Sequence, residues 1–190
     1  VCQVPAAGGP VQAIAGGSVE MERMVVDAEN STAAVRVLPQ SSLSNVSTVD
    51  LGTGEMTRVT DYNEAYFGQH PSGVMEKFTI TRSGFEIESR LILPPEFDES
   101  QRYPLVVDIH GGPQGRFTDG FRLDHQVLAS AGYVVLSVNP RGSSSYGHDF
   151  SRAVLQDWGG EDYRDIMAAL DEVCARDYVD ETRLGVGGFS

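Results

Sequence analysis

The chain contains a short, nearly unbroken apolar run, Leu105-Val106-Val107-Asp108-Ile109, which leads directly into His110-Gly111-Gly112-Pro113. Such a run is typical of a strand that is buried on both faces of a parallel sheet. The two glycines allow a sharp turn and leave backbone N–H groups unobstructed, as an oxyanion-binding loop requires. We therefore predict a buried strand followed by a candidate oxyanion loop. A plain turn is the alternative, because Gly-Gly pairs follow many strands.

The sequence on either side of this strand alternates between strand and helix patterns. The predicted elements are a hairpin of 78–82 and 85–93, a helix over 121–131 closed by Gly132, a buried strand over 133–138, a helix over 161–176 and a strand over 184–188. The apolar face of the last helix is formed by Tyr163, Ile166, Met167, Leu170, Val173 and Cys174. Strands that alternate with helices imply a parallel sheet with helices on both sides. Residues 77–190 are therefore predicted to be α/β.

A second motif follows the last predicted strand, where Gly188-Phe189-Ser190 forms the first half of the pattern Gly-x-Ser-x-Gly. In this nucleophile elbow, a strained strand-to-helix turn exposes a serine hydroxyl. The pattern places small residues at flanking positions such as Gly188, because larger side chains there would clash with neighbouring strands. Half an elbow is a weak signal alone. An oxyanion loop after one strand and a serine two strands later together indicate the α/β-hydrolase arrangement.

Residues 1–60 differ in pattern, since Val, Thr, Ser and Gly occur there in the short alternating runs of small antiparallel strands. A weak repeat aligns Val1–Val4 and Gly9 with Val46–Val49 and Gly54, at an offset of 45 residues. Each copy is predicted to form a strand, a tight glycine turn and a second strand. A period of about 40–50 residues is typical of a β-propeller blade. The alignment rests on only three identities, so chance similarity is the alternative.

Composition restricts the function classes. The 190 residues carry 14 Lys+Arg against 27 Asp+Glu, a formal net charge of −13, so we expect neither a nucleic acid nor a membrane as partner. No apolar run approaches the roughly 18–20 residues of a membrane span.

The two cysteines, Cys2 and Cys174, are expected to be apolar fillers rather than a disulfide. No spacing of Cys and His suggests zinc and no phosphate-binding loop is evident, so no metal or cofactor is expected. Two N-glycosylation patterns, at Asn30 and Asn45, are of a kind frequent by chance.

Several motifs together resemble a known family. Pro104–Pro113 resembles the start of the catalytic domain in the prolyl oligopeptidase family, closest to its acylaminoacyl-peptidase/dipeptidyl-peptidase branch. The matching motifs are Ala131-Gly132-Tyr133, Asn139-Pro140-Arg141-Gly142-Ser143, Tyr146-Gly147, Asp157-Trp158-Gly159, Asp162, Asp165 and the run from Arg183 to Ser190. The family carries a β-propeller before its hydrolase domain. The resemblance thus implies an α/β fold in which 1–76 are the last strands of a propeller, fewer than two blades, and 77–190 are the first half of an α/β-hydrolase domain.

The resemblance also implies roles for single residues. Ser190 would be the acylated nucleophile, and the Gly112 backbone N–H one oxyanion donor. His110 stands where other branches carry a tyrosine that helps to bind the oxyanion. In members with His-Gly-Gly-Pro the ring is expected to be a scaffold for the loop, with direct contact with the oxyanion as the alternative. Arg141 is expected to brace its loop by ion pairing. The aspartates at 157, 162 and 165 are placed in a loop and a helix N-terminus, not in the catalytic triad.

In this fold the triad residues follow the order Ser, Asp/Glu, His. All four histidines, at 70, 110, 125 and 148, precede Ser190. We therefore expect the chain as written to be an incomplete and inactive portion, because a serine without a base is a weak nucleophile.

The expected function of the longer protein is a serine-type peptidase acting on short peptides through an acyl-enzyme on Ser190. It would be an oligopeptidase or an acylaminoacyl- or dipeptidyl-peptidase. The alternatives are a carboxylesterase of the same fold and a non-catalytic propeller binding module with a degenerate hydrolase domain. The expected partner is a peptide substrate, and homo-oligomerisation is left open. We expect a cytoplasmic location, with a periplasmic or secreted one as the alternative.

Overall fold

The computed structural model describes residues 1–17, 19–29 and 31–190. The chain divides into two compact units. The first unit consists of Val1–Pro71 together with the short segment Thr118–Arg122, and the second consists of Ser72–Phe117 and Leu123–Ser190.

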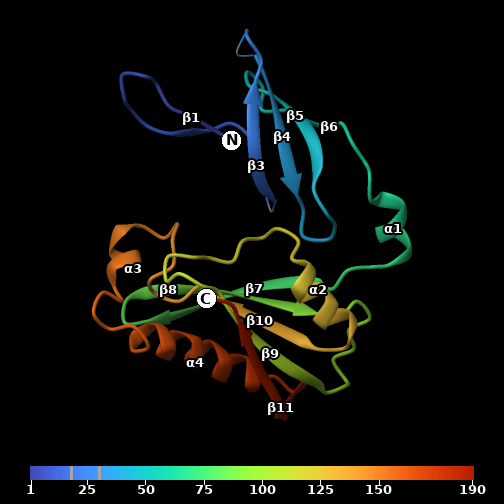
Figure 1. Cartoon of the computed structure of the whole chain (residues 1–190), viewed down its shortest axis with the longest axis vertical. Helices are drawn as coiled ribbons and strands as arrows, with labels where there is room; N and C mark the ends of the chain where they lie inside the picture. Colours follow the sequence, from blue (N-terminus) through green and yellow to red (C-terminus); the bar gives the residue numbers. More distant parts are fainter. Residues whose placement is uncertain (18, 30) are drawn as a thin grey trace. The chain divides into compact units, whose positions relative to one another are not determined.

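The second unit is built on a five-stranded sheet (Figure 1). Its strands are β7 (Val74–Arg82), β8 (Phe85–Leu93), β9 (Tyr103–Ile109), β10 (Val134–Val138) and β11 (Val179–Gly188), in the order β11-β9-β10-β8-β7. β9 lies between β10 and β11 and is parallel to both, as the sequence predicts. β8 is antiparallel to β7 and to β10, so the predicted hairpin joins the same sheet and makes it mixed.

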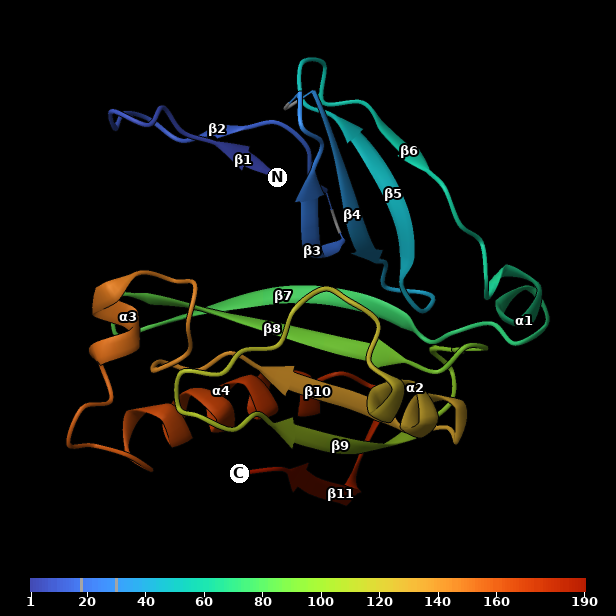
Figure 2. The same cartoon turned by 45° about the horizontal axis from the view of Figure 1, so that its top comes forward.

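Helices pack on both faces of this sheet, namely α2 (Leu123–Ser130) and α4 (Glu161–Cys174), as Figure 2 lets the reader follow. Successive side chains of a strand point to opposite faces. Leu91 and Leu136 therefore share one buried cluster with Val173 of α4. Their neighbours along the strands pack with α2 instead, in a second cluster of Ile92, Val135 and Ala129. Burial on both faces explains why β10 is apolar almost throughout.

Helices α2 and α4 are shorter than predicted. α2 begins at Leu123 rather than at Phe121, whose backbone N–H donates a hydrogen bond to the Pro39 carbonyl within the first unit (2.8 Å). The predicted stop at Gly132 is confirmed, with φ +86°. α4 ends at Cys174, two residues before the predicted end. Tyr163, predicted on its apolar face, is 55% exposed.

Two short helices were not predicted, α1 (Glu64–Gln69) and α3 (His148–Arg152). With 6 and 5 residues respectively, each is too short for an apolar periodicity to be visible.

The first unit contains two antiparallel sheets, as the alternating runs predict. One has four strands in sequence order, β3 (Glu20–Val26), β4 (Thr32–Leu38), β5 (Asn45–Asp50) and β6 (Met56–Arg58), and the other is the hairpin of β1 (Cys2–Gln3) and β2 (Gln12–Ala13). Its buried core is formed by Ala33, Val35, Val37 and Val49.

The structure gives the weak repeat a geometric counterpart. Cys2 pairs with Ala13 in the first hairpin, and Ser47 pairs with Arg58 in the hairpin of β5 and β6. Each residue number in the second pair is 45 higher than its counterpart in the first pair. The next pair along each hairpin also differs by 45. The two strand–turn–strand units therefore have the same register, which three identities alone did not establish.

Other side-chain expectations have mixed outcomes. Cys2 is exposed, so the expectation that it is an apolar filler is wrong. Cys174 is partly buried against the core, and this burial raises the pKa of its thiol. Asn30 lies outside the described residues, whereas Asn45 is buried and its Oδ1 accepts a hydrogen bond from the Thr60 hydroxyl (3.0 Å). Among the described helices, none has the length and apolar character needed to cross a membrane.

Candidate active site

The two sequence motifs meet at one edge of the sheet. Ile109 pairs with Gly188 at the carboxyl ends of the parallel strands β9 and β11. The His110–Pro113 loop and the Phe189-Ser190 segment therefore leave the sheet side by side. A Cβ atom added at Gly111 would lie 2.8 Å from the Ser190 Cβ and 2.7 Å from the Phe189 carbonyl oxygen. The loop and the serine are thus in direct contact.

The backbone of Ser190 adopts the left-handed conformation, with φ +77°. This region is unfavourable for a residue with a Cβ, and such strain is found where the backbone turns sharply at functional sites. A Cβ at Gly188 would lie 2.6 Å from the Ile109 carbonyl oxygen. The predicted reason for small residues beside the serine is therefore confirmed at Gly188. The local geometry is that of the first half of a nucleophile elbow.

Gly112 combines two properties of an oxyanion donor. Its φ of +144° favours glycine, and an added Cβ would lie 2.4 Å from the Gly115 nitrogen, so the loop is tightly turned here. Gly112 is exposed, and its N–H makes no hydrogen bond with any residue that the structure describes. The following peptide bond to Pro113 is cis. Hydrogen bonding to an oxyanion, the role expected of Gly112, needs an N–H group that no other residue occupies.

The His110 ring is held inside the loop network. Its Nδ1 lies 2.9 Å from the Gly111 carbonyl oxygen and its Nε2 lies 3.0 Å from the Ser143 Oγ. The ring also contacts Phe117 edge-on, with centroids 5.2 Å apart. Both nitrogens are therefore engaged by the protein, an arrangement that favours the scaffold role over direct contact with an oxyanion. Direct contact stays a prediction.

Arg141 braces its loop by ion pairing, as predicted. Its Nε and Nη2 lie 2.8 and 2.7 Å from the two carboxylate oxygens of Asp165, which is fully buried. The Arg141 backbone N–H also donates to Asp165 (3.0 Å), and the guanidinium reaches Glu161 (2.5 Å). The hydrogen bonds with Asp165 raise the pKa of Arg141 above its usual value. The charge is therefore permanent, and the loop is fixed to α4.

The other two aspartates lie at the start of α4, also as predicted. Asp157 accepts a hydrogen bond from the Glu161 backbone N–H (3.0 Å), and Asp162 accepts one from the Tyr163 N–H (2.9 Å). They satisfy donors that the first helical turn leaves without a partner.

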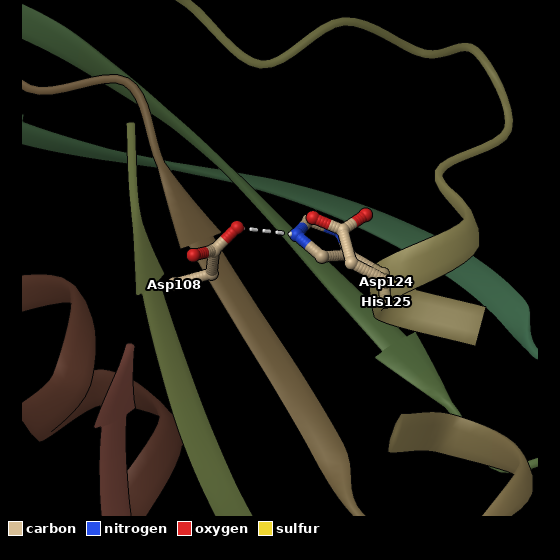
Figure 3. Close-up of side chains that lie close together, drawn as sticks. All are labelled: Asp108, Asp124 and His125. Atoms are coloured by element: carbon tan, nitrogen blue, oxygen red, sulfur yellow. Dashed lines mark hydrogen bonds and ion pairs between the residues drawn. The ribbon is translucent and has the colours of Figure 1, made fainter. Parts of the chain in front are cut away.

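A further group of side chains was not singled out from the sequence. Asp108, Asp124 and His125 place their ligand-type atoms within 4.8 Å of one another (Figure 3). His125 is only 3% exposed, and its Nε2 lies 2.8 Å from Asp108 Oδ2. This pair connects α2 to β9, the strand that leads into the oxyanion loop. The only sequence signal was the acidic residue inside an apolar strand, because its partner is 17 residues away on a helix.

These features define a mixed α/β unit in which a strand-end serine with left-handed backbone contacts a Gly-Gly loop on the neighbouring parallel strand. Residues 119–190 match the profile of the Prolyl oligopeptidase family. This segment thus matches that family, and the resemblance inferred from the motifs is confirmed.

The chain is also similar to individual proteins. It is 38% identical over 149 residues to the "Uncharacterized peptidase YuxL" of Bacillus subtilis, covering 77% of this chain and 22% of that protein. It is 35% identical over 166 residues to "Dipeptidyl-peptidase 5" of Aspergillus fumigatus, covering 79% and 23%. The solved structure of a Pyrococcus horikoshii acylaminoacyl peptidase has a TM-score of 0.86 and 30% identity, covering 96% of this chain and 29% of that one. The chain therefore spans less than a quarter of the length of the curated relatives described here.

Proposed function

We propose that the protein to which this chain belongs is a serine peptidase that hydrolyses short peptides, of the acylaminoacyl- or dipeptidyl-peptidase kind. The observation that carries the proposal is the placement of Ser190, left-handed at the end of β11 and in contact with the Gly111-Gly112 loop. The family match and the names of the similar proteins supply the reaction class.

The proposed reaction begins with attack of the Ser190 Oγ on the carbonyl carbon of a scissile peptide bond. A general base takes the hydroxyl proton and later gives it to the leaving amine, so that an acyl-enzyme ester remains on Ser190. The Gly112 N–H donates a hydrogen bond to the oxyanion of the tetrahedral intermediate. His110 keeps the loop in shape rather than binding the oxyanion itself.

The base and its acid partner are not assigned to residues of this chain. In the family's order both follow the nucleophile, and the four histidines of this sequence precede it. We propose that residues after Ser190 in the whole protein supply both groups. The 190-residue chain alone is accordingly proposed to be inactive.

The domain arrangement is part of the same proposal. The predicted boundary between residues 76 and 77 falls within β7, so the last strands of a β-propeller would end before Ser72, and the first part of an α/β-hydrolase domain would begin there. The four-stranded antiparallel sheet and the equal registers of the two hairpins support the propeller. A propeller would admit only short or unfolded peptides to the site. A cytoplasmic location and homo-oligomerisation stay predictions.

Two alternatives use the same observations. A carboxylesterase would need the same serine and loop, because ester and peptide hydrolysis pass through similar tetrahedral intermediates. A non-catalytic binding module would keep the fold and lose the base. The similar proteins named as peptidases favour the peptidase over both.

Kinetics on the full-length protein separate the three functions. Purified protein is assayed on peptide anilides, with free and acylated N-termini, and on short p-nitrophenyl esters. We expect hydrolysis of the anilides, and a loss of kcat of about 10⁴-fold or more in Ser190→Ala. Ser100→Ala, which removes an exposed hydroxyl bonded to Asp98, is the control. A large preference for esters would favour the esterase, and full activity of Ser190→Ala would overturn the mechanism.

A further inference from the structure

Two loops meet at the carboxyl ends of β9 and β10, the oxyanion loop (110–115) and the loop that follows β10 (139–144). They are joined by two contacts. The Ser143 Oγ lies 3.0 Å from the His110 Nε2, and the Ser144 backbone N–H donates to the Gly115 carbonyl (3.2 Å). The first contact involves two side chains and can therefore be removed by substitution.

Ser143 is a fixed point on the second loop. It is fully buried, its Oγ lies 2.7 Å from the Pro140 carbonyl oxygen, and its own carbonyl accepts a hydrogen bond from the Ser151 hydroxyl (3.0 Å). The preceding Arg141 is held by the buried carboxylate of Asp165. The loop that carries Ser143 is thus held by hydrogen bonds to two helices, to α3 through Ser151 and to α4 through Asp165.

The hydrogen bonds of His110 connect Ser143 to the oxyanion loop. The Gly111 carbonyl can only accept, so the His110 Nδ1 carries the hydrogen of the 2.9 Å contact. With the hydrogen on Nδ1, the Nε2 atom accepts, and the Ser143 hydroxyl lies within hydrogen-bond distance of both this atom (3.0 Å) and the Pro140 carbonyl oxygen (2.7 Å). Ser143 therefore holds the His110 ring in one orientation, and the ring in turn fixes the direction of the Gly111 carbonyl.

The last step follows from peptide geometry. The Gly111 carbonyl and the Gly112 N–H belong to one planar peptide unit, in which a trans bond makes the two groups point in opposite directions. Fixing the carbonyl fixes the N–H. This is the N–H that has no hydrogen-bond partner among the described residues, and it belongs to an exposed residue next to Gly111, which contacts Ser190.

We propose that Ser143 is a positioning residue for oxyanion stabilisation, acting through His110 on the orientation of the Gly112 N–H. The inference rests on the proposed function, because it needs a reaction at Ser190. Ser143 itself touches neither substrate nor the reacting atoms.

The test uses full-length protein and a peptide anilide substrate. An oxyanion donor acts in the transition state more than in the ground state, so Ser143→Ala is expected to lower kcat about tenfold and to change KM less than twofold. Ser143→Thr retains the hydroxyl and is expected to recover most of the loss. Ser144→Ala is the matched control, because it removes the neighbouring hydroxyl of the same loop, which bonds to no residue that the structure describes, and it keeps the backbone contact with Gly115. It is expected to keep kcat within twofold.

A double-mutant cycle separates positioning from a general loss of structure. If Ser143 acts through His110, Ser143→Ala has little further effect on kcat in a His110→Ala background. Multiplicative losses in the cycle, or an unchanged kcat in a folded Ser143→Ala protein, would overturn the inference. Should Ser143→Ala not fold, Ser143→Cys takes its place, and an unchanged kcat in that variant has the same meaning. Full activity of Ser190→Ala would instead reject the proposed function.

Discussion

Arg141 illustrates how single residues hold the site's loops. Its guanidinium and backbone N–H both bond to Asp165, whose carboxylate is fully buried. Arg82 from β7 and Glu161 at the start of α4 join the same group of charges. A buried carboxylate of this kind is stable only with such partners, since burying a lone charge is costly. These hydrogen bonds and ion pairs therefore hold the loop after β10 against α4.

Glu161 makes this group sensitive to acid. Hydrogen bonds from Arg164, then Arg82 and Arg141, lower the pKa of its carboxyl to about 2 from 4.5. A carboxyl whose pKa is lower in the folded state stabilises the fold above its unfolded pKa, and this contribution disappears as the pH falls toward the folded value. Glu161→Gln is therefore expected to lower the melting temperature at pH 7, with a difference from wild type that shrinks between pH 4.5 and 2.

Thermal unfolding of both proteins across this pH range checks the expectation. Glu172→Gln is the control, since it removes an exposed glutamate from the same helix. A difference that stays constant from pH 7 to pH 3 would show that the charge of Glu161 does not contribute.

Among the elements, β9 and β11 have the closest bearing on the site, because their paired carboxyl ends place the glycine loop against Ser190. Gly111→Ala would add a Cβ 2.7 Å from the Phe189 carbonyl oxygen and 2.8 Å from the Ser190 Cβ. The backbone near the serine must then move. A displacement of about 1 Å at a catalytic group can cost about 100-fold in rate, so we expect kcat/KM to fall by about 10- to 100-fold.

Gly187→Ala provides the matched control. It lies in β11, one residue from Gly188, and an added Cβ there meets no atom of the described residues within 4 Å. Its activity and melting temperature should match those of the wild type. Equal losses in Gly111→Ala and Gly187→Ala would contradict the contact between the loop and the serine.

The elements also show what sequence patterns can and cannot predict. β9, β10 and α4 were predicted because burial gives them apolar runs or a helical periodicity. The start of α2 was placed too early, since Phe121 is apolar but its backbone bonds to Pro39 rather than to the helix. The pair of Asp108 and His125 was not predicted, because its members are far apart in the chain and meet only when α2 packs on the sheet.

The site itself was predicted in part. The half elbow and the Gly-Gly loop could be read from glycines whose conformational freedom the turns require. The contact of His110 with Ser143 could not, because two loops that are separated by β10 and α2 approach each other only in the folded sheet. The half elbow and the family resemblance indicate the nucleophile, and the structure adds how its surroundings are held.

At the scale of the whole molecule, this chain accounts for less than a quarter of the length of the curated relatives described above. Its two hairpins with equal register indicate repetition in the first unit, and its second unit carries the serine and the loop. The proposed activity therefore belongs to the protein as a whole.

The most direct measurement is covalent labelling of the full-length protein with a fluorophosphonate, followed by mass spectrometry of its peptides. Such probes react with serines that a base activates. The account predicts one probe per protein, on Ser190, and no labelling of Ser190→Ala. Labelling of a different serine, or peptide hydrolysis that persists while Ser190 stays unmodified, would contradict it.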